Sequence, residues 1–396
     1  METIYQVNLM PIEPILFSDN RSARAGEDHL IRDQDPSPHT IYGAIGACLA
    51  GAFGAEIDQK KWTAEAKKYL GDFITDIKNG STERAELMGF FYKNAQDEFW
   101  FPRPLHVRLR QRYANQPVVA GKRMRIKPQK PGLAASSLQD FENYLFFERD
   151  DDEAELDDYL SANLLQNILC GVDLSNKLLL ENERLPLENI YKSETRLGLG
   201  MDNDANRPRR GLLFSRPYRR FSSRAHAESG EWRSAGLTAF YKTREPIPPQ
   251  KIPANQLAFL GGDRGRALIQ FVETSQPLQN LRLAVENAAA PSDGFFCYLL
   301  TPAVREARWP LIERQQPIAA AIGKEKVISG WDRAASQQPR PIRKLAPAGS
   351  TLFFNWPAHL DRVELIRKYW LQPIAADHFR NSGFGRMLIG VWKNEN

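Results

Sequence analysis

The sequence predicts an α+β fold, and three local patterns support that prediction. Residues 5–9 alternate apolar and polar side chains, which is the period of a strand with one buried face. Residues 37–53 begin with Ser-Pro and continue as an apolar segment rich in glycine and alanine, the pattern of a capped helix. The runs LMGFFY at 87–92 and FWF at 99–101 flank a short polar turn and predict a hairpin.

The later elements continue this mixture of helices and strands. Apolar residues at helical spacing predict an amphipathic helix at 60–78. The segment 257–273 has the pattern of a strand, a glycine loop and a second strand. A further strand is predicted at 295–302, and the closing segments 348–356 and 382–392 continue the α+β pattern of the second half. Four prolines within 245–253 indicate a linker, and we predict two domains, 1–225 and 226–396.

The composition is that of a globular protein. Of 396 residues, 42% are hydrophobic and 26% are charged, so disorder is not expected. Cys48, Cys170 and Cys297 stand far apart without a CxxC pair, which supports neither a disulfide framework nor a zinc site. The N-terminus lacks a secretory signal, and the uncharged stretch 41–55 is too short to span a bilayer. We expect a cytoplasmic protein with no metal, cofactor or membrane contact.

Charge is gathered into blocks of one sign, although the net charge is only +5. Residues 108–133 hold eight basic side chains, three prolines and no acid, which predicts an extended or hairpin excursion. The stretch 148–158 follows with eight acids against one arginine. We interpret it as a solvated helix start, with a contact to a basic neighbouring subunit as the alternative.

Six arginines and no acid fall within residues 206–220. Two prolines and a glycine divide this run, which favours a hairpin over a helix. Crowded guanidinium groups need an anionic partner. We expect a mobile basic hairpin that grips single-stranded RNA, with pairing to the acids of 148–158 as the alternative.

Two glycine loops also carry arginines. In GGDRGRA at 261–267, Arg264 and Arg266 lie among three glycines, so backbone amides and guanidinium groups can both face a phosphate. SGFGRMLIG at 382–390 partly resembles an RNA-recognition strand, with Arg386 where a stacking aromatic is expected. Each loop alone is compatible with a tight turn. Together with the basic segments they favour RNA as the partner.

Motifs for catalysis are weak in this sequence. The six histidines are scattered without metal-ligand spacing, and neither a GxSxG elbow nor a Walker motif is present. We therefore expect no catalytic activity. A repeat-cleaving endoribonuclease with His29 or His39 as the general base is the alternative, and a protein-interaction scaffold is a third interpretation.

Several motifs, taken in order, resemble one family. They are PIEPILFSDNRSARAG at 11–26, SPHTIYGAIGACLA at 37–50, SETRLGL at 193–199, GLLFSRPY at 211–218, LGGDRGRA at 260–267, ISGWD at 328–332, PAGSTLFF at 347–354 and GFGRMLIG at 383–390. In this order, over nearly the whole chain, they resemble the RAMP superfamily of CRISPR effector proteins. The resemblance is to subunit three of the Cmr (type III-B) complex, in the Cas-five group, with the related type III-D subunit as the alternative.

The resemblance implies two ferredoxin-like (RRM-like, RAMP) domains with basic hairpin and loop insertions. It also implies a non-catalytic subunit that holds the five-prime repeat-derived handle of a CRISPR RNA in antiviral defence. The implied partners are the large polymerase-like subunit, a RAMP backbone subunit and target RNA within the complex. From charge, the glycine loops and the resemblance, the candidate RNA-binding residues are Arg21, Arg24, Lys122, Arg123, Arg125, Arg207, Arg209, Arg210, Arg216, Tyr218, Arg219, Arg220, Arg264, Arg266, Trp331 and Arg386.

Overall fold

The fold combines helices with antiparallel sheets, which confirms the predicted α+β class. The computed structural model describes residues 2–18, 33–54, 69, 85–111, 117–120, 125–128, 143–146, 154–156, 158–202, 207–225, 232–274, 278–305, 311–329, 331–332, 338–339, 341–374 and 381–393. The helix predicted at 60–78 lies outside these residues, apart from Tyr69. Across the described ranges, no helix is both long and apolar enough to cross a membrane.

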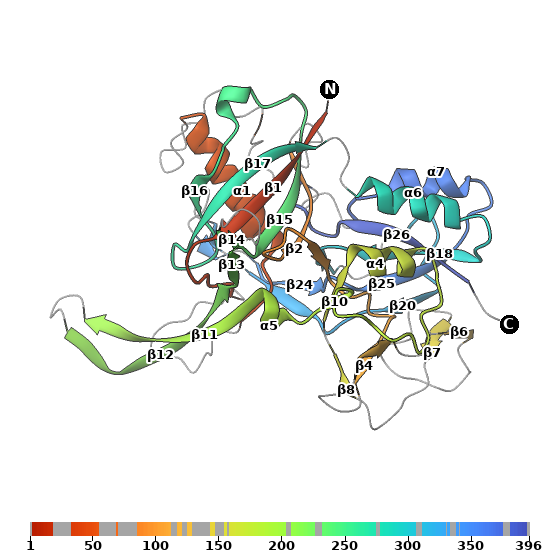
Figure 1. Ribbon diagram of the computed structural model, residues 1–396, viewed down its shortest axis with the longest axis horizontal. Helices are drawn as coiled ribbons and strands as arrows, with labels where there is room; N and C mark the ends of the chain where they lie inside the picture. Colours follow the sequence, from red (N-terminus) through yellow and green to blue (C-terminus); the bar gives the residue numbers. More distant parts are fainter. Residues whose placement is uncertain are drawn as a thin grey trace.

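An eight-stranded sheet forms one side of the molecule (Figure 1). Its strands, in spatial order, are β10 (Arg184–Leu185), β9 (Tyr159–Ser161), β3 (Phe99–Phe101), β2 (Glu86–Lys93), β15 (Gly236–Thr243), β1 (Thr3–Pro11), β17 (Arg266–Thr274) and β16 (Gln256–Phe259). In β1, Val7 lies opposite Ala239 of β15 and Phe271 of β17. The strand predicted at 5–9 and the hairpin predicted at 87–101 are both present.

This sheet crosses the boundary predicted at residue 225. β15, β16 and β17 complete the sheet that β1 begins, so the change from one sheet to the next falls after Thr274. The proline-rich segment 245–253 connects two strands of the same sheet and contains a short 3-10 turn, Pro249–Lys251. Because both edges of β1 pair with strands distant in sequence, a local composition signal does not reveal this arrangement.

Helix α1 (Pro38–Ala52) covers one face of this sheet. Ser37 is its N-cap, and its side-chain oxygen accepts a hydrogen bond from the backbone N–H of Thr40 at 3.2 Å, as the sequence predicts. Ile45 and Leu49 are fully buried in the core that α1 forms with the sheet. The opposite face of the sheet contributes Met88 and Phe91 to a second core.

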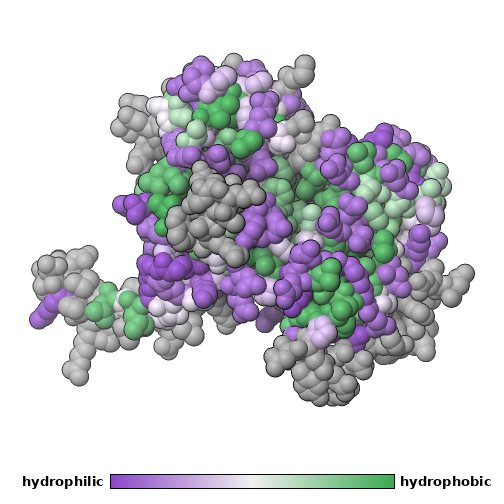
Figure 2. Space-filling view, in the orientation of Figure 1, coloured by the Kyte–Doolittle hydropathy of each residue, from purple (hydrophilic) through white to green (hydrophobic). Residues whose placement is uncertain are grey.

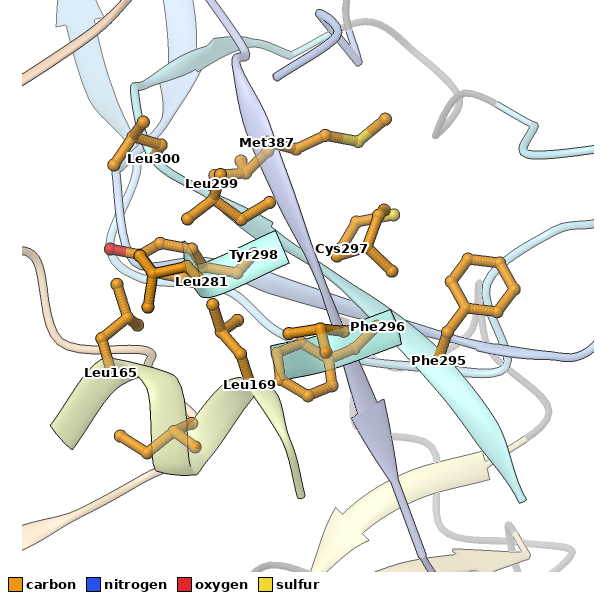
Figure 3. Packing of buried hydrophobic residues seen from close by; sticks show 14 of the residues in the cluster. Leu165, Leu169, Leu281, Phe295, Phe296, Cys297, Tyr298, Leu299, Leu300 and Met387 are labelled. Carbon is orange, nitrogen blue, oxygen red and sulfur yellow. The ribbon is translucent and has the colours of Figure 1, made fainter. Parts of the chain in front are cut away.

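A second sheet follows in the order β20 (Ala319–Ala321), β25 (Thr351–Asn355), β18 (Gly294–Leu299) and β26 (Met387–Trp392). Its core is packed by helices α4 (Ala162–Leu169), α6 (Gln279–Ala288) and α7 (Arg362–Tyr369). Figure 3 shows Leu165 and Leu169 of α4 packed near Leu281 of α6 and the side chains of β18. The strand predicted at 295–302 is present as β18, and the segments 348–356 and 382–392 contain β25 and β26.

Shorter strands complete the fold. One sheet joins β19 (Ala303–Val304), β24 (Arg343–Ala346) and β21 (Lys326–Ile328). The remaining pairs are β6 (Arg125–Pro128) with β7 (Asn143–Phe146), β13 (Ser223–Ala225) with β14 (Trp232–Ser234), and β22 (Trp331–Asp332) with β23 (Gln338–Pro339).

The basic and acidic blocks meet in a small sheet. β4 (Leu109–Gln111) pairs with β5 (Val119–Ala120) and with β8 (Ala154–Glu155), and Arg110 lies opposite Glu155. The helix start predicted for the acidic block is therefore wrong at 154–155, because pairing with the basic strand holds the chain extended. The acids from 148 to 153 lie outside the described residues, as does Asp157.

Arg386 is a structural residue and not a surface cation. Its side chain is 0% exposed and donates to the Leu371 carbonyl at 3.0 Å and to the Glu86 carboxylate at 3.1 Å. The assignment of Arg386 as an RNA contact is wrong, because a guanidinium group with no exposed surface cannot reach a phosphate. It instead ties the start of β26 to β2 of the first sheet.

We predict that Arg386→Ala destabilises the protein by roughly 3–5 kcal/mol, because it leaves the Glu86 carboxylate partly buried without this cation. Urea denaturation followed by circular dichroism measures this change. Arg264→Ala is the matched control, since Arg264 is exposed and its loss costs less than about 0.5 kcal/mol. Equal stability of the two variants would contradict the structural role.

Candidate nucleic-acid interface

The arginine-rich run forms one strand of a long hairpin. β11 (Tyr191–Asp202) and β12 (Arg207–Phe221) pair with each other in a two-stranded sheet and extend as an arm from the body of the protein (Figure 1). The run 206–220 was predicted to fold into a hairpin by itself, but residues 207–221 form one continuous strand, and the hairpin arises from its pairing with β11. Figure 2 shows hydrophilic residues gathered where the arm joins the body.

One face of this arm carries charge. In the antiparallel register, Arg196 lies opposite Arg216, and Glu194 lies opposite Tyr218, so these four side chains share a face. Arg196 donates to Glu194 at 2.8 Å and lies 4.7 Å above the Tyr218 ring. Arg220 forms a second ion pair with Glu194 at 2.6 Å. We call this set the charged face of the arm.

The glycine loop reaches the charged face through a short segment of the N-terminal region. Ile15 exchanges backbone hydrogen bonds with Arg219 of β12 at 2.8 and 2.9 Å. The next residue, Leu16, accepts a hydrogen bond from the backbone N–H of Gly262 at 2.8 Å. Residues 15–16 therefore lie between the arm and the loop 260–266. Three of the sequence motifs that are far apart in the chain converge at this point.

The loop contributes a carboxylate to the charged face. Asp263 accepts hydrogen bonds from Arg216 Nη1 and from Tyr218 Oη, each at 2.5 Å. Burial alone raises the pKa of Asp263, but the hydrogen bonds from Tyr218 and Arg216 outweigh it and lower the pKa below its usual value. The carboxylate is thus held ionised against the arginine.

The other face of the arm is anchored by Arg219. Its side chain is 3% exposed, forms ion pairs with Asp33 at 2.8 Å and Asp35 at 3.5 Å, and lies 4.3 Å above the Tyr191 ring. It also donates to the hydroxyl of Tyr92 in β2 at 2.5 Å. The assignment of Arg219 as an RNA contact is corrected by this burial: it joins the root of the arm to the first sheet.

The two carboxylates that share Arg219 differ in pKa. Desolvation raises the pKa of Asp33 despite the nearby guanidinium group. Asp35 is also desolvated, but Lys326 pairs with it at 2.6 Å and, together with Arg219, lowers its pKa. Because Lys326 belongs to β21, the Arg219 cluster also reaches the three-stranded sheet of the C-terminal part.

A cavity of about 360 Å³ opens beside this cluster. Tyr92 and Tyr159 of the first sheet line it, and so do Asp35, Lys324 and Lys326. The two tyrosine rings meet edge to face with centroids 5.0 Å apart. The cavity thus combines aromatic surface with two cations at the foot of the arm.

Apart from the buried Arg386 and from Tyr218, which donates to Asp263, the predicted RNA-binding residues fall into three groups. Among the described residues, Arg207 and Arg264 are exposed and have no carboxylate partner, whereas Arg266 pairs with Glu13 at 3.0 Å. The second group consists of arginines of β12 that form ion pairs with carboxylates: Arg216, Arg219 and Arg220. Arg21, Arg24, Lys122 and Arg123 lie outside the described residues, and the same holds for the side chains of Arg125, Arg209, Arg210 and Trp331.

The ion pairs described for arginines of the arm are formed with carboxylates other than those of the 148–158 block. Their partners are Asp33, Asp35, Glu194 and Asp263, while Asp158 of the acidic block pairs with Arg184. Residues of the site that were not predicted from the sequence are Lys324, Lys326 and the four acids. Asp263 stands inside the GGDRG motif itself, so attention to all its residues, not only its arginines, could have found it.

Comparisons with known proteins decide the family. The family model described as CRISPR-associated protein (Cas_Cmr3) matches residues 7–392. The chain belongs to the Cmr3 family. This confirms the resemblance to subunit three of the Cmr complex. No curated protein matches the chain.

Solved structures give a more distant similarity to this Cmr3-family chain. One is a chain of "Cryo-EM structure of the Type III-B Cmr-beta bound to cognate target RNA", with 14% identity and a TM-score of 0.45. The match covers 88% of this chain and 86% of that one. A chain of the same complex "bound to cognate target RNA and AMPPnP, state 1" matches with the same values.

We predict that Arg219→Gln loosens the root of the arm, because it leaves Asp33 and Asp35 without their shared guanidinium group. Proteinase K should cut between residues 191 and 221 several-fold faster than in the unaltered protein. Arg220→Gln is the control, since Arg220 is exposed and its one carboxylate partner among the described residues is Glu194 of the arm itself. Equal cleavage rates in the two variants would show that the buried cluster does not hold the arm.

Proposed function

We propose that this Cmr3-family chain is a non-catalytic RNA-binding subunit of a type III-B effector complex, and that it holds the five-prime repeat-derived handle of the CRISPR RNA. One observation supports this most strongly: the charged face of the arm, the glycine loop and a cavity of nucleotide size lie together at the root of the arm. Single-stranded RNA is bound by such combinations of cations and aromatic surface.

Each part has a distinct role in this proposal. Arg207 and Arg264 contact phosphates and supply most of the salt-dependent affinity, because an arginine that neutralises a phosphate releases counterions condensed on the RNA. The cavity takes one unstacked base against Tyr92 or Tyr159, while Lys324 and Lys326 face its phosphate. The two ferredoxin-like units implied by the resemblance would provide the framework for these contacts.

Protein partners belong to the same proposal. The sheet face opposite α1 exposes Leu257, Phe259 and Val272 on β16 and β17. Exposed apolar side chains gathered on one sheet face favour a protein contact. We propose that the chain docks on the large polymerase-like subunit and on a RAMP backbone subunit, in a cytoplasmic complex that also engages target RNA.

The absence of catalysis is likewise a proposal. His39, the candidate general base within the described residues, packs edge to face against Phe384 with ring centroids 4.8 Å apart. A ring in this contact serves the packing of α1 against the C-terminal part. His29 lies outside the described residues.

The test is the binding of a short fluorescent single-stranded RNA by the purified chain. Replacing Arg207 and Arg264 together with glutamine should weaken binding roughly tenfold and leave the melting temperature unchanged. If each arginine neutralises one phosphate, the log–log slope of affinity against salt should become flatter by about 1.4 units.

The control replaces Arg244 and Arg314, which are also exposed, with glutamine and should retain the slope. A slope that changes equally in both double variants would show non-specific charge binding. The bound RNA is also examined on a denaturing gel. Recovery of intact RNA supports a binding subunit, whereas shortened RNA would favour the endoribonuclease alternative.

A further inference from the structure

The charged face of the arm contains a ready anion site whose occupant comes from the chain itself. We propose that Arg216 and Tyr218 form a phosphate-binding site that the free protein keeps closed with the carboxylate of Asp263, and that an RNA phosphate displaces this carboxylate. The inference rests on the proposed RNA-binding function and adds a regulatory contact to it.

The contacts of Asp263 are those that a phosphate oxygen would make. Arg216 Nη1 donates to both carboxylate oxygens at 2.5 Å, and the Tyr218 hydroxyl donates to one of them, also at 2.5 Å. Arg196 stacks on the Tyr218 ring and adds a second guanidinium group to the same face. Two donors that converge on one anion, with a further cation beside them, suit a phosphodiester as well as a carboxylate.

The placement of Asp263 requires an unusual backbone. Asp263 and Arg264 both have left-handed conformations, with φ of 53° and 57°, and Gly261 precedes them with φ of 76°. Left-handed conformations of consecutive non-glycine residues carry strain of about 1 kcal/mol or more each. The N-terminal segment holds the loop, since the Leu16 carbonyl oxygen accepts a hydrogen bond from the Gly262 N–H at 2.8 Å. This close approach requires glycine at 261, where a Cβ would lie only 2.5 Å from the same oxygen.

In this turn the side chains of Asp263 and Arg264 have different surroundings. Asp263 contacts the arm, while Arg264 is exposed beside it without a carboxylate partner among the described residues. A phosphate that enters next to Arg264 therefore meets a cation first and a replaceable carboxylate second. Since the side chains of Arg216 and Asp263 remain 27% and 35% exposed, water and ligand can reach the pair. Surface ion pairs of this kind exchange partners at small cost.

The proposal predicts that removal of the carboxylate charge strengthens anion binding. Asp263→Asn should raise the affinity for a short single-stranded RNA roughly three- to tenfold, because the competing charge is lost. The double variant Asp263→Asn/Arg216→Gln should lose this gain. Asp97→Asn is a matched control, since Asp97 also has a positive φ, of 65°, and also pairs with a cation, Lys93, but lies on the turn between β2 and β3.

A second readout separates this proposal from the RNA-binding function. Inorganic pyrophosphate should raise the melting temperature of Asp263→Asn more than that of the unaltered protein or of Asp97→Asn, because a ligand stabilises the state that binds it. RNA bound equally well by Asp263→Asn and the unaltered protein would overturn the displacement and leave the proposed function intact. Pyrophosphate stabilisation of Asp263→Asn without RNA binding by any variant would retain the anion site and overturn the proposed function. If Asp263→Asn shows neither the gain in RNA affinity nor the gain in pyrophosphate stabilisation, the closed phosphate site is overturned.

Discussion

The position of the basic arm relative to the first sheet depends on the buried guanidinium group of Arg219. A two-stranded hairpin is only marginally stable in water, so an arm such as β11–β12 depends on its attachment at the root. Arg219 provides that attachment through Asp33, Asp35 and the hydroxyl of Tyr92. Without these partners the burial of a charged group would be strongly unfavourable. The cluster therefore determines which face of the arm packs on the body and which face carries exposed charge.

The exposed face that results is largely neutralised by its own carboxylates. Glu13, Glu194 and Asp263 each pair with arginines near the root of the arm. RNA binding at this face would replace carboxylate partners by phosphates, so part of the electrostatic gain offsets lost ion pairs. Under the proposed function, such an arrangement would limit non-specific binding of polyanions and leave recognition to the shape of the face and to the neighbouring cavity.

Local patterns in the sequence predicted several helices and strands, but they did not predict which side chains would be buried or which partners they would have. The Ser37 cap and the hairpin at 87–101 follow from short-range rules of capping and alternation. The basic run was correctly predicted not to be a helix, but its pairing with β11 was not predicted. Arg219, Arg264 and Arg386 look alike in sequence, yet one anchors the arm, one is exposed and one lies in the core. What distinguishes the two buried arginines is a distant carboxylate partner: Asp33 lies 186 residues from Arg219, and Glu86 lies 300 residues from Arg386. The role of Asp263 was likewise hidden, because its partners in β12 are 45 and 47 residues distant.

The central claim is that RNA lies across the root of the arm, between β12 and the glycine loop. Ultraviolet crosslinking of the assembled complex, followed by mass spectrometry of the crosslinked peptides, measures this directly. This placement of the RNA predicts crosslinks to peptides that contain residues 207–221 and 260–266. Crosslinks confined to other surfaces, such as the exposed face of β16 and β17, would contradict it.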